Sequence, residues 1–255
     1  MHPVLIGPIK SFGFMLAVSF AVGIWLAARR GRARGLAPET AYDLSFVILI
    51  SSLIGVRGFY VVTHLDQFAG QWLKIFAFKE GGLTLYGGLV GALAAGWFFC
   101  RRRGMNYLAA ADLMIPSVAL GIGLTRIGCF LAGCCHGHPC DLPWAVRFPA
   151  GSPADQLFGP VAVHPSQLYA SLGGLAIFGL LLWWQRLSDR RGETIGRFLL
   201  LYGVDRFLVD FTRYYESSQQ MMFGWSNNQW ISVGMVLVGL ALMLTARGRA
   251  ESRFD

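Results

Sequence analysis

Seven long apolar stretches, separated by shorter polar segments, dominate the pattern of hydrophobic and polar positions along the chain. They cover residues 11–28, 40–63, 83–100, 107–124, 167–184, 195–211 and 229–246. An α-helix that crosses the hydrocarbon core of a bilayer needs about 20 apolar residues, with a range of about 17–25. The pattern therefore predicts an all-α polytopic membrane protein with about seven transmembrane helices, forming a single integral membrane domain over residues 1–255.

Composition and charge support this class. Hydrophobic residues make up 55% of the chain and charged residues 14%, whereas a soluble domain carries about 25% charged residues. Basic residues mark cytoplasmic loops, so we expect the N-terminus and the 125–166 loop outside, the C-terminus in the cytoplasm, and no nucleic-acid partner. The arginine clusters follow the first, third, fifth and last stretches: Arg29, Arg30, Arg32 and Arg34; Arg101, Arg102 and Arg103; Arg186, Arg190 and Arg191; Arg247, Arg249 and Arg253.

Two further segments are predicted to lie at the membrane interface. Residues 65–78 read as a short amphipathic helix on the outer surface, and the aromatic-rich segment 214–230 as a second interfacial piece. The apolar face of the first is formed by Leu65, Phe68, Trp72, Ile75 and Phe76. Residues 125–166 are expected to form an extracytoplasmic signature loop and a small head region, with a short strand at 144–148.

Arg57 lies within the second apolar stretch. An arginine inside a membrane helix costs about 2.5–3.5 kcal/mol on insertion scales. Two interpretations stay open. Its guanidinium is either paired or facing a polar cavity, which makes it a candidate substrate-binding residue, or it extends to the nearby interface.

The sixth stretch is the most polar of the seven, with Tyr202, Asp205, Arg206 and Asp210 near its outer end. Residues four positions apart share a helix face, so Arg206 can pair with Asp210 and with Tyr202. This group either locks the helix bundle or lines a cavity or substrate path, as charges at such depth often do.

Arg126, beyond the fourth stretch, is predicted to lie at the same outer level as Arg206. Guanidinium groups are permanently charged, planar donors that suit phosphate ligands. The phosphates plentiful at this depth are lipid head groups. The sequence thus predicts a phospholipid-binding cavity that opens to the outer leaflet.

Four of the five cysteines, Cys129, Cys134, Cys135 and Cys140, lie close together after Arg126, with His136 and His138 among them. Zinc is one interpretation, because thiolate and imidazole are its preferred ligands, although a C-x2-C pair is missing. The others are a disulfide involving Cys140 in an oxidising compartment, a catalytic or redox thiol whose pKa is lowered by Arg126, and plain packing. All stay open, and no metal ligand or cofactor is assigned.

These motifs, in this order, resemble the prolipoprotein diacylglyceryl transferase family over most of the chain. The resemblance is carried by Tyr86-Gly87-Gly88, by the segment from Arg126 through Gly128, Cys129 and Gly133 to Gly137, by His164-Pro165-Ser166-Gln167-Leu168-Tyr169, and by Tyr202-Gly203-Val204-Asp205-Arg206. The glycine-rich signature after Arg126 is the most specific of them.

The resemblance implies an enzyme that moves the diacylglyceryl group of phosphatidylglycerol onto the lipobox cysteine of a preprolipoprotein and releases glycerol phosphate. Arg126 and Arg206 would hold the phosphate and offset its charge, and Tyr202 would orient Arg206 or the head group. The implied partners are phosphatidylglycerol, membrane lipids and a prolipoprotein signal peptide. The implied location is the bacterial inner membrane, with the active site facing the extracytoplasmic side.

The chain departs from the family pattern where protons are handled. Tyr86 stands where the family has the histidine of a His-Gly-Gly motif, and a tyrosine with its ordinary pKa of about 10 is a poor base for a thiol. Cys129 and Ala132 replace asparagines of the signature, and Cys134 replaces its glutamate. The acid one turn beyond Arg206 is kept as Asp210. The resemblance therefore indicates a divergent, cysteine-rich branch.

Three functions stay open from the sequence. The first is the ordinary transferase, with His164 or Asp210 replacing the missing base. The second is a related lipid transferase that uses Cys129 or Cys134 as nucleophile or serves another acceptor. The third is a non-catalytic membrane protein that binds lipid or metal. The candidate catalytic residues are Arg126, Arg206, Tyr86, Cys129, Cys134 and His164. The candidate substrate-binding residues are Arg57, Gly87, Gly88, Gly128, Gly133, Gly137, Tyr202 and Asp210.

Overall fold

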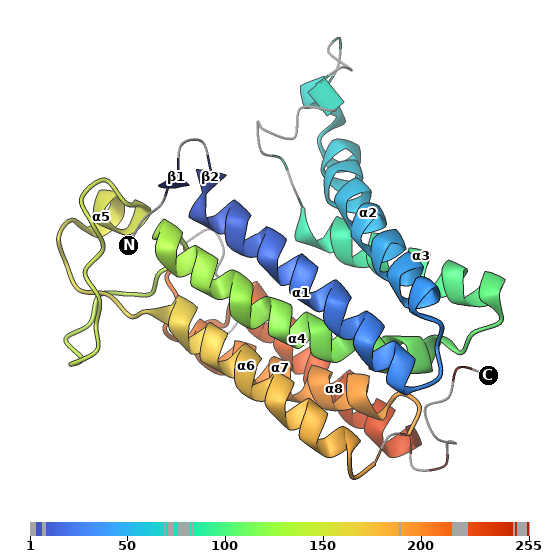
Figure 1. The fold of residues 1–255 in the computed structure, drawn as a ribbon. Helices are drawn as coiled ribbons and strands as arrows, with labels where there is room; N and C mark the ends of the chain where they lie inside the picture. Colours follow the sequence, from blue (N-terminus) through green and yellow to red (C-terminus); the bar gives the residue numbers. More distant parts are fainter. Residues whose placement is uncertain are drawn as a thin grey trace. The chain divides into compact units, whose positions relative to one another are not determined.

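The computed structural model describes residues 4–6, 9–68, 70, 74–75, 82, 84–188, 190–215, 224–246, 248 and 254. Within these residues the chain is mainly helical (Figure 1). The long helices are α1 (Ser11–Ala33), α2 (Pro38–Thr63), α3 (Leu85–Arg103), α4 (Tyr107–Ala132), α6 (Ser166–Gln185), α7 (Glu193–Asp210) and α8 (Asn227–Ala246). The short elements are β1 (Val4–Ile6), β2 (Ile9–Lys10), the 3₁₀ helix η1 (Leu65–Phe68) and α5 (Pro153–Phe158).

Each of the seven predicted apolar stretches coincides with one long helix, so the helical membrane class is confirmed. Five of these helices, α1, α2, α4, α6 and α8, are long and apolar enough to cross a bilayer in the described part of the chain. The other two are more polar. Helix α3 ends in three arginines, and α7 carries Glu193, Arg197, Asp205, Arg206 and Asp210.

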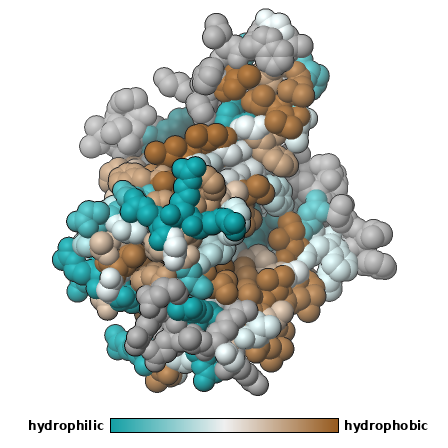
Figure 2. Space-filling view, turned by 90° about the vertical axis from the view of Figure 1, so that its right-hand side faces the viewer, coloured by the Kyte–Doolittle hydropathy of each residue, from teal (hydrophilic) through white to brown (hydrophobic). Residues whose placement is uncertain are grey.

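The outward surfaces of the helices are apolar. Large side chains such as Trp25, Ile54, Leu93, Leu172 and Leu237 are exposed, and hydrophobic residues cover much of the face drawn in Figure 2. An exposed apolar surface of this kind is unfavourable in water but matches the hydrocarbon of a bilayer. The distribution fits helices that are surrounded by lipid.

The chain forms two compact units, one of residues 1–26 and 111–252 and the other of residues 27–110 and 253–255. In the first unit α4, α6 and α7 share a core of Ala119, Ile177, Leu181 and Phe198. Asp112 accepts hydrogen bonds from the backbone N–H groups of Gly192 and Ile195, at 2.6 and 2.8 Å. It therefore satisfies free donors at the N-terminus of α7 and fixes the start of that helix.

In the second unit α2 and α3 pack backbone to backbone. A Cβ atom at Gly87 would overlap the Gly55 carbonyl, and one at Gly88 would lie 2.7 Å from Val56. The glycines of the Tyr86-Gly87-Gly88 motif thus serve close helix packing.

Three local predictions were wrong. Helix α4 does not end at 124 but continues to Ala132, because the apolar pattern persists until Gly133, whose φ is +73°. The strand expected at 144–148 is a single bridge between Val146 and Val163. The helix expected over 65–78 is a 3₁₀ helix that ends at Phe68; Trp72 and Phe76 lie outside the described residues, as do residues 216–223 of the second interfacial segment.

Candidate active site

The end of α4 carries two of the predicted site residues. Arg126 and Cys129 are three positions apart on this helix and therefore share a face. Cys129 is buried, whereas Arg126 is half-buried. Among the residues that the structure describes, none lies within hydrogen-bond or ion-pair distance of the Arg126 guanidinium. A permanent charge without a partner among these residues is suited to an anionic ligand.

The glycines around this helix end allow close approach of neighbouring segments. A Cβ atom at Gly128 would lie 2.8 Å from Cβ of Met15 on α1. One at Gly137 would overlap the Thr212 carbonyl and the side chains of His164 and Ser166. Both are therefore packing positions, and Gly137 joins the segment after α4 to the segment after α7 through a backbone bridge with Arg213.

Helix α4 ends in a Schellman motif, in which two backbone hydrogen bonds close the last turn around a left-handed residue. Gly133 is that residue; its N–H donates to the Phe130 carbonyl at 3.2 Å. The Cys134 N–H donates to the Cys129 carbonyl at 3.1 Å. This motif brings the side chains at the two ends of the six-residue turn together, and here those side chains are Cys129 and Cys134.

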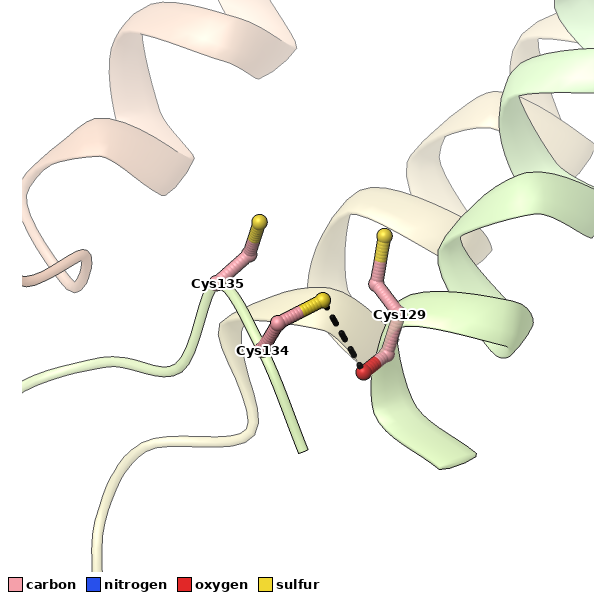
Figure 3. Close-up of side chains that lie close together, drawn as sticks. All are labelled: Cys129, Cys134 and Cys135. Carbon is pink, nitrogen blue, oxygen red and sulfur yellow. Dashed lines mark hydrogen bonds between the residues drawn. The ribbon is translucent and has the colours of Figure 1, made fainter. Parts of the chain in front are cut away.

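A third thiol joins them. Cys135 has a φ of +60°, the one positive φ of a non-glycine residue in the described part of the chain. The Sγ atoms of Cys129, Cys134 and Cys135 all lie within 4.8 Å of one another. Figure 3 shows the three side chains gathered at the helix end, with the Cys134 thiol donating to the Cys129 carbonyl at 3.7 Å.

The three thiols differ in how readily they ionise. Hydrogen bonds from Cys129 and Cys134 lower the pKa of the Cys135 thiol, and the charges of Arg213 and Arg126 act in the same direction against its burial. The pKa of Cys134 is raised, first by its hydrogen bond with Cys129. The two arginines therefore favour a thiolate at Cys135.

Arg206 stands at the outer end of α7 in a polar network. Its Nη1 atom lies 2.7 Å from Oδ1 of Asp210, which confirms the predicted pairing along the helix. Its Nη2 atom donates to the Tyr215 hydroxyl at 2.5 Å, and this hydroxyl donates to Asp210 at 2.5 Å. Ser226 donates to the other Asp210 oxygen. The carboxylate thus holds Arg206 and Tyr215 in fixed positions, because charge-assisted hydrogen bonds are strong and directional.

A cavity of about 160 Å³ lies beside this network. Asp210, Arg213, Tyr215 and Ser226 line it together with His138. The Arg213 guanidinium carbon lies 5.1 Å from the Tyr215 ring centre, and its buried Nε has no hydrogen-bond partner among the described residues. Burial raises the pKa of Tyr215, so its hydroxyl keeps its proton and remains a donor. The cavity is large enough for a phosphate-sized group or a few water molecules.

Asp205 of α7 lies in the electrostatic field of the two arginines that the sequence singled out. Its carboxylate lies against Gly173 of α6, where a Cβ atom would overlap it. The charges of Arg206 and of Arg126 both act on this carboxylate. Electrostatic interaction falls with distance, so both arginines contribute to the electrostatic environment of Asp205.

Comparison with known proteins decides the family. The family model for prolipoprotein diacylglyceryl transferase matches residues 3–245. The chain belongs to this family. It is 35% identical to a phosphatidylglycerol–prolipoprotein diacylglyceryl transferase of Idiomarina loihiensis, over 94% of this chain and 89% of the relative. Relatives of the same name from Chromohalobacter salexigens and Clostridium tetani are 35% and 30% identical, covering 96% and 95% of this chain and 91% and 95% of their own length.

In this diacylglyceryl transferase family member, the second unit holds Tyr86 and Arg57. Tyr86 is the second residue of α3 and is half exposed. Arg57 is buried, and three of its N–H groups donate to the carbonyls of Ile75, Gly82 and Lys74, at 2.8, 3.1 and 2.5 Å. The pairing interpretation of Arg57 is therefore confirmed, with backbone carbonyls among its partners.

Two other predicted site residues have ordinary surroundings. Tyr202 stacks on Phe198, with parallel rings 5.4 Å apart, inside the core of the first unit. His164 lies in the head region, where its Nδ1 atom is 3.4 Å from the Tyr169 hydroxyl, which in turn accepts from Trp144. Both side chains thus pack against another aromatic side chain.

Several residues of the site escaped the sequence analysis. Tyr215, Arg213 and Ser226 lie in segments that the sequence assigns to the interface or to a loop, and nothing in their spacing indicates the Asp210 network. Cys135 was noticed only as part of the cysteine group. One sequence pattern could have predicted that these cysteines come together. Cys129 and Cys134 are five positions apart at a helix end, and Gly133 directly precedes the second of them.

Proposed function

We propose that this chain transfers the diacylglyceryl group of phosphatidylglycerol to the thiol of the lipobox cysteine of a prolipoprotein. The proposal follows the names of the relatives, which cover most of the chain. The observation that carries it is the Arg126 guanidinium, which has no hydrogen-bond or ion-pair partner among the described residues, together with Arg206, which Asp210 and Tyr215 hold in place. In the reaction the acceptor sulfur bonds to the glyceryl carbon, the bond from that carbon to the phosphate oxygen breaks, and glycerol phosphate leaves.

Negative charge grows on the phosphate as the bond to carbon breaks, because a diester becomes a monoester. Arg126 has no partner among the described residues, so its donors are available to the phosphate oxygens. Arg206 is held by Asp210 and Tyr215 in one orientation. Donors that are fixed before the reaction stabilise developing charge without reorganisation. In this proposal Arg126 binds the departing phosphate directly, and Arg206 supports it from α7.

The proposal includes the membrane arrangement. The chain crosses the bacterial inner membrane seven times, with the N-terminus outside and the C-terminus in the cytoplasm, as the arginine clusters after alternate helices indicate. The network around Arg206 and the 125–166 region then face the extracytoplasmic side, where lipoprotein precursors present their signal peptides.

A covalent intermediate on a cysteine of the chain is less favourable. The first half of such a route would leave a thioether on Cys129 or Cys134. In the second half, the acceptor thiol would have to displace the cysteine thiolate from this thioether, and a thiolate is a poor leaving group. Covalent catalysis helps only when both steps are easier than direct transfer, which is not the case here. Direct transfer between the two substrates is the simpler route.

A reconstituted assay tests the proposal. The full chain in vesicles with phosphatidylglycerol is incubated with a signal peptide that carries a lipobox cysteine, and mass spectrometry measures the peptide. We expect a mass increase of one diacylglyceryl group, absent when serine replaces the peptide cysteine or phosphatidylethanolamine replaces the lipid. An unmodified peptide, together with failure to rescue a transferase-deficient bacterium, would exclude the proposal.

A further inference from the structure

The thiol group at the end of α4 has the composition of a metal site. Cys129, Cys134 and Cys135 supply three sulfur atoms within 4.8 Å of one another, and no fourth ligand atom from a described residue belongs to the group. Zn–S bonds are about 2.3 Å long in a tetrahedral site, which places bound sulfurs about 3.8 Å apart. Small rotations about the single side-chain torsion of each cysteine close this difference.

From this geometry we propose that Cys129, Cys134 and Cys135 bind a Zn²⁺ ion and leave its fourth coordination position open for the acceptor thiol. The second half of the statement rests on the proposed transferase function. Three protein ligands with one open position are the pattern of catalytic zinc sites, whereas structural sites use four.

The backbone supports the site independently of the thiols. The Schellman motif fixes Cys129 and Cys134, and the positive φ of Cys135 is a conformation that ordinary residues avoid. The buried Gln167 amide donates to the Cys134 carbonyl at 2.8 Å and holds the loop from outside, while its Oε1 atom has no partner among the described residues. Hydrogen bonds behind the ligands orient them in metal sites.

Helix α3 offers a comparison within the same chain. It ends in a similar turn around Gly104, whose φ is +65°, with the Met105 N–H donating to the Cys100 carbonyl at 2.9 Å. There the paired positions hold one thiol and one thioether, and no further cysteine follows. The turn alone therefore brings together the two side chains at its ends, in α3 as in α4. The third thiol, Cys135, distinguishes the end of α4 from the end of α3.

The surrounding charge favours an anionic metal–thiolate centre. Three thiolates and one Zn²⁺ ion carry a net charge of minus one, and the charges of Arg126 and Arg213 both act on this group. Oxidation to a disulfide would remove two ligands, so the proposal requires that the three thiols stay reduced or metal-bound.

A metal ion with an open coordination position beside Arg126 would remove the proton of the acceptor thiol. Tyr86 is a poor base for this step. A thiol that coordinates a metal loses its proton, so the acceptor cysteine would bind as a thiolate and its proton would pass to water. Arg126 lies three positions before Cys129 on the same helix face. The sulfur nucleophile would then attack the glyceryl carbon of a lipid whose phosphate is held by Arg126.

Metal analysis of the full chain tests the site. The protein is purified in detergent under reducing conditions with a tag that does not bind metals, and zinc is measured by mass spectrometry. We expect about one zinc per chain, and at least a tenfold loss of bound zinc in each of Cys129→Ser, Cys134→Ser and Cys135→Ser. Cys100→Ser and Cys140→Ser are matched controls that keep it. Zinc-free wild type at micromolar free Zn²⁺, or a disulfide within the group, would overturn the proposal.

Cobalt substitution makes the test independent of the variants. Wild-type protein loaded with Co²⁺ should show a thiolate-to-cobalt charge-transfer band. The bands should shift when the cysteine peptide is added, and remain unchanged with the serine peptide. If the absorption bands of the cobalt-loaded protein do not change when the cysteine peptide is added, the open coordination position and its role in thiol activation are refuted.

The outcomes separate this inference from the transferase proposal. Full transfer by metal-free protein would refute the zinc site as part of the reaction and leave the transferase function standing. Stoichiometric zinc with a coordinated peptide thiol, but without transfer from phosphatidylglycerol, would refute the transferase function and leave the site standing.

Discussion

Two regions of this molecule place an arginine near the end of an apolar helix and treat it in opposite ways. At Arg57 in α2, carbonyl groups of three residues between 74 and 82 take up N–H donors of the guanidinium, and the rings of Tyr60 and Phe68 lie 5.8 and 5.4 Å from its central carbon. At Arg126 in α4, no described residue lies within hydrogen-bond distance. The two arginines lie at similar positions relative to the ends of their helices. The N–H donors of Arg57 are bound by backbone carbonyls, whereas those of Arg126 have no acceptor among the described residues.

The difference separates a structural charge from a functional one. A guanidinium whose donors are taken by main-chain carbonyls joins its helix to a loop and has less capacity for a ligand. For a partly buried guanidinium without a partner, the unfavourable free energy of desolvation is not offset until an anion binds to it. Arg206 is intermediate, because Asp210 and Tyr215 hold it on one side.

The largest effect is expected at Arg126. Arg126→Lys keeps the charge but removes the planar pair of donors that suits phosphate. We predict a decrease in the transfer rate of about 10²–10³-fold, the usual loss when one donor to a developing oxyanion is removed. The peptide mass assay measures the rate. The melting temperature should stay unchanged, because no hydrogen bond or ion pair among the described residues is lost, and a rate near that of wild type would place the phosphate elsewhere.

A smaller effect is expected around Arg206. Tyr215→Phe removes the hydroxyl that links Arg206 to Asp210 and that accepts from Asn228 at 3.0 Å. Arg206 keeps its ion pair, so we predict a decrease in the transfer rate of about tenfold, equivalent to about 1.4 kcal/mol.

The neighbouring Tyr214 provides a matched control for this variant. Its ring stacks on His136, with the ring centres 6.2 Å apart, and its hydroxyl belongs to none of the hydrogen bonds around Asp210. Tyr214→Phe should therefore leave the rate within about twofold of wild type, since the change preserves the apolar ring contacts. Equal losses in the two variants would show that the Tyr215 hydroxyl does not position Arg206.

The sequence predicted the helices and the Arg206–Asp210 pair because both depend on local spacing. Apolar runs of membrane length and residues four positions apart are visible without any tertiary information. The packing role of Gly87 and Gly88 was also accessible from the small residues alone.

The remainder of the site could not be predicted, because it depends on contacts between distant segments. Tyr215 and Ser226 reach Asp210 from beyond the end of α7, and Asp205 meets Gly173 from another helix. Two of the carbonyl partners of Arg57, those of Lys74 and Ile75, belong to the segment 65–78 that had been interpreted as an interfacial helix. A backbone acceptor leaves no trace in residue identity, so the sequence could state only that Arg57 needs a partner.

The smallest effect on transfer, and the largest on stability, is expected at Arg57. Arg57→Gln removes charge-assisted hydrogen bonds to three carbonyls, and a hydrogen bond to a charged group contributes about 1.5–3 kcal/mol. We predict a lower melting temperature and faster proteolysis within residues 69–83.

The transfer rate per folded molecule, in contrast, should stay within a few-fold of wild type, because the donors of Arg57 are already engaged by the protein. Arg103→Gln is the control. Its partner Asp43 lies 3.0 Å away in the same unit, and both side chains are about half exposed, at 51% and 52%; such a surface ion pair contributes about 0–1 kcal/mol. A large loss of transfer with unchanged stability in Arg57→Gln would show that Arg57 also binds the substrate, and the contrast with Arg126 would then fail.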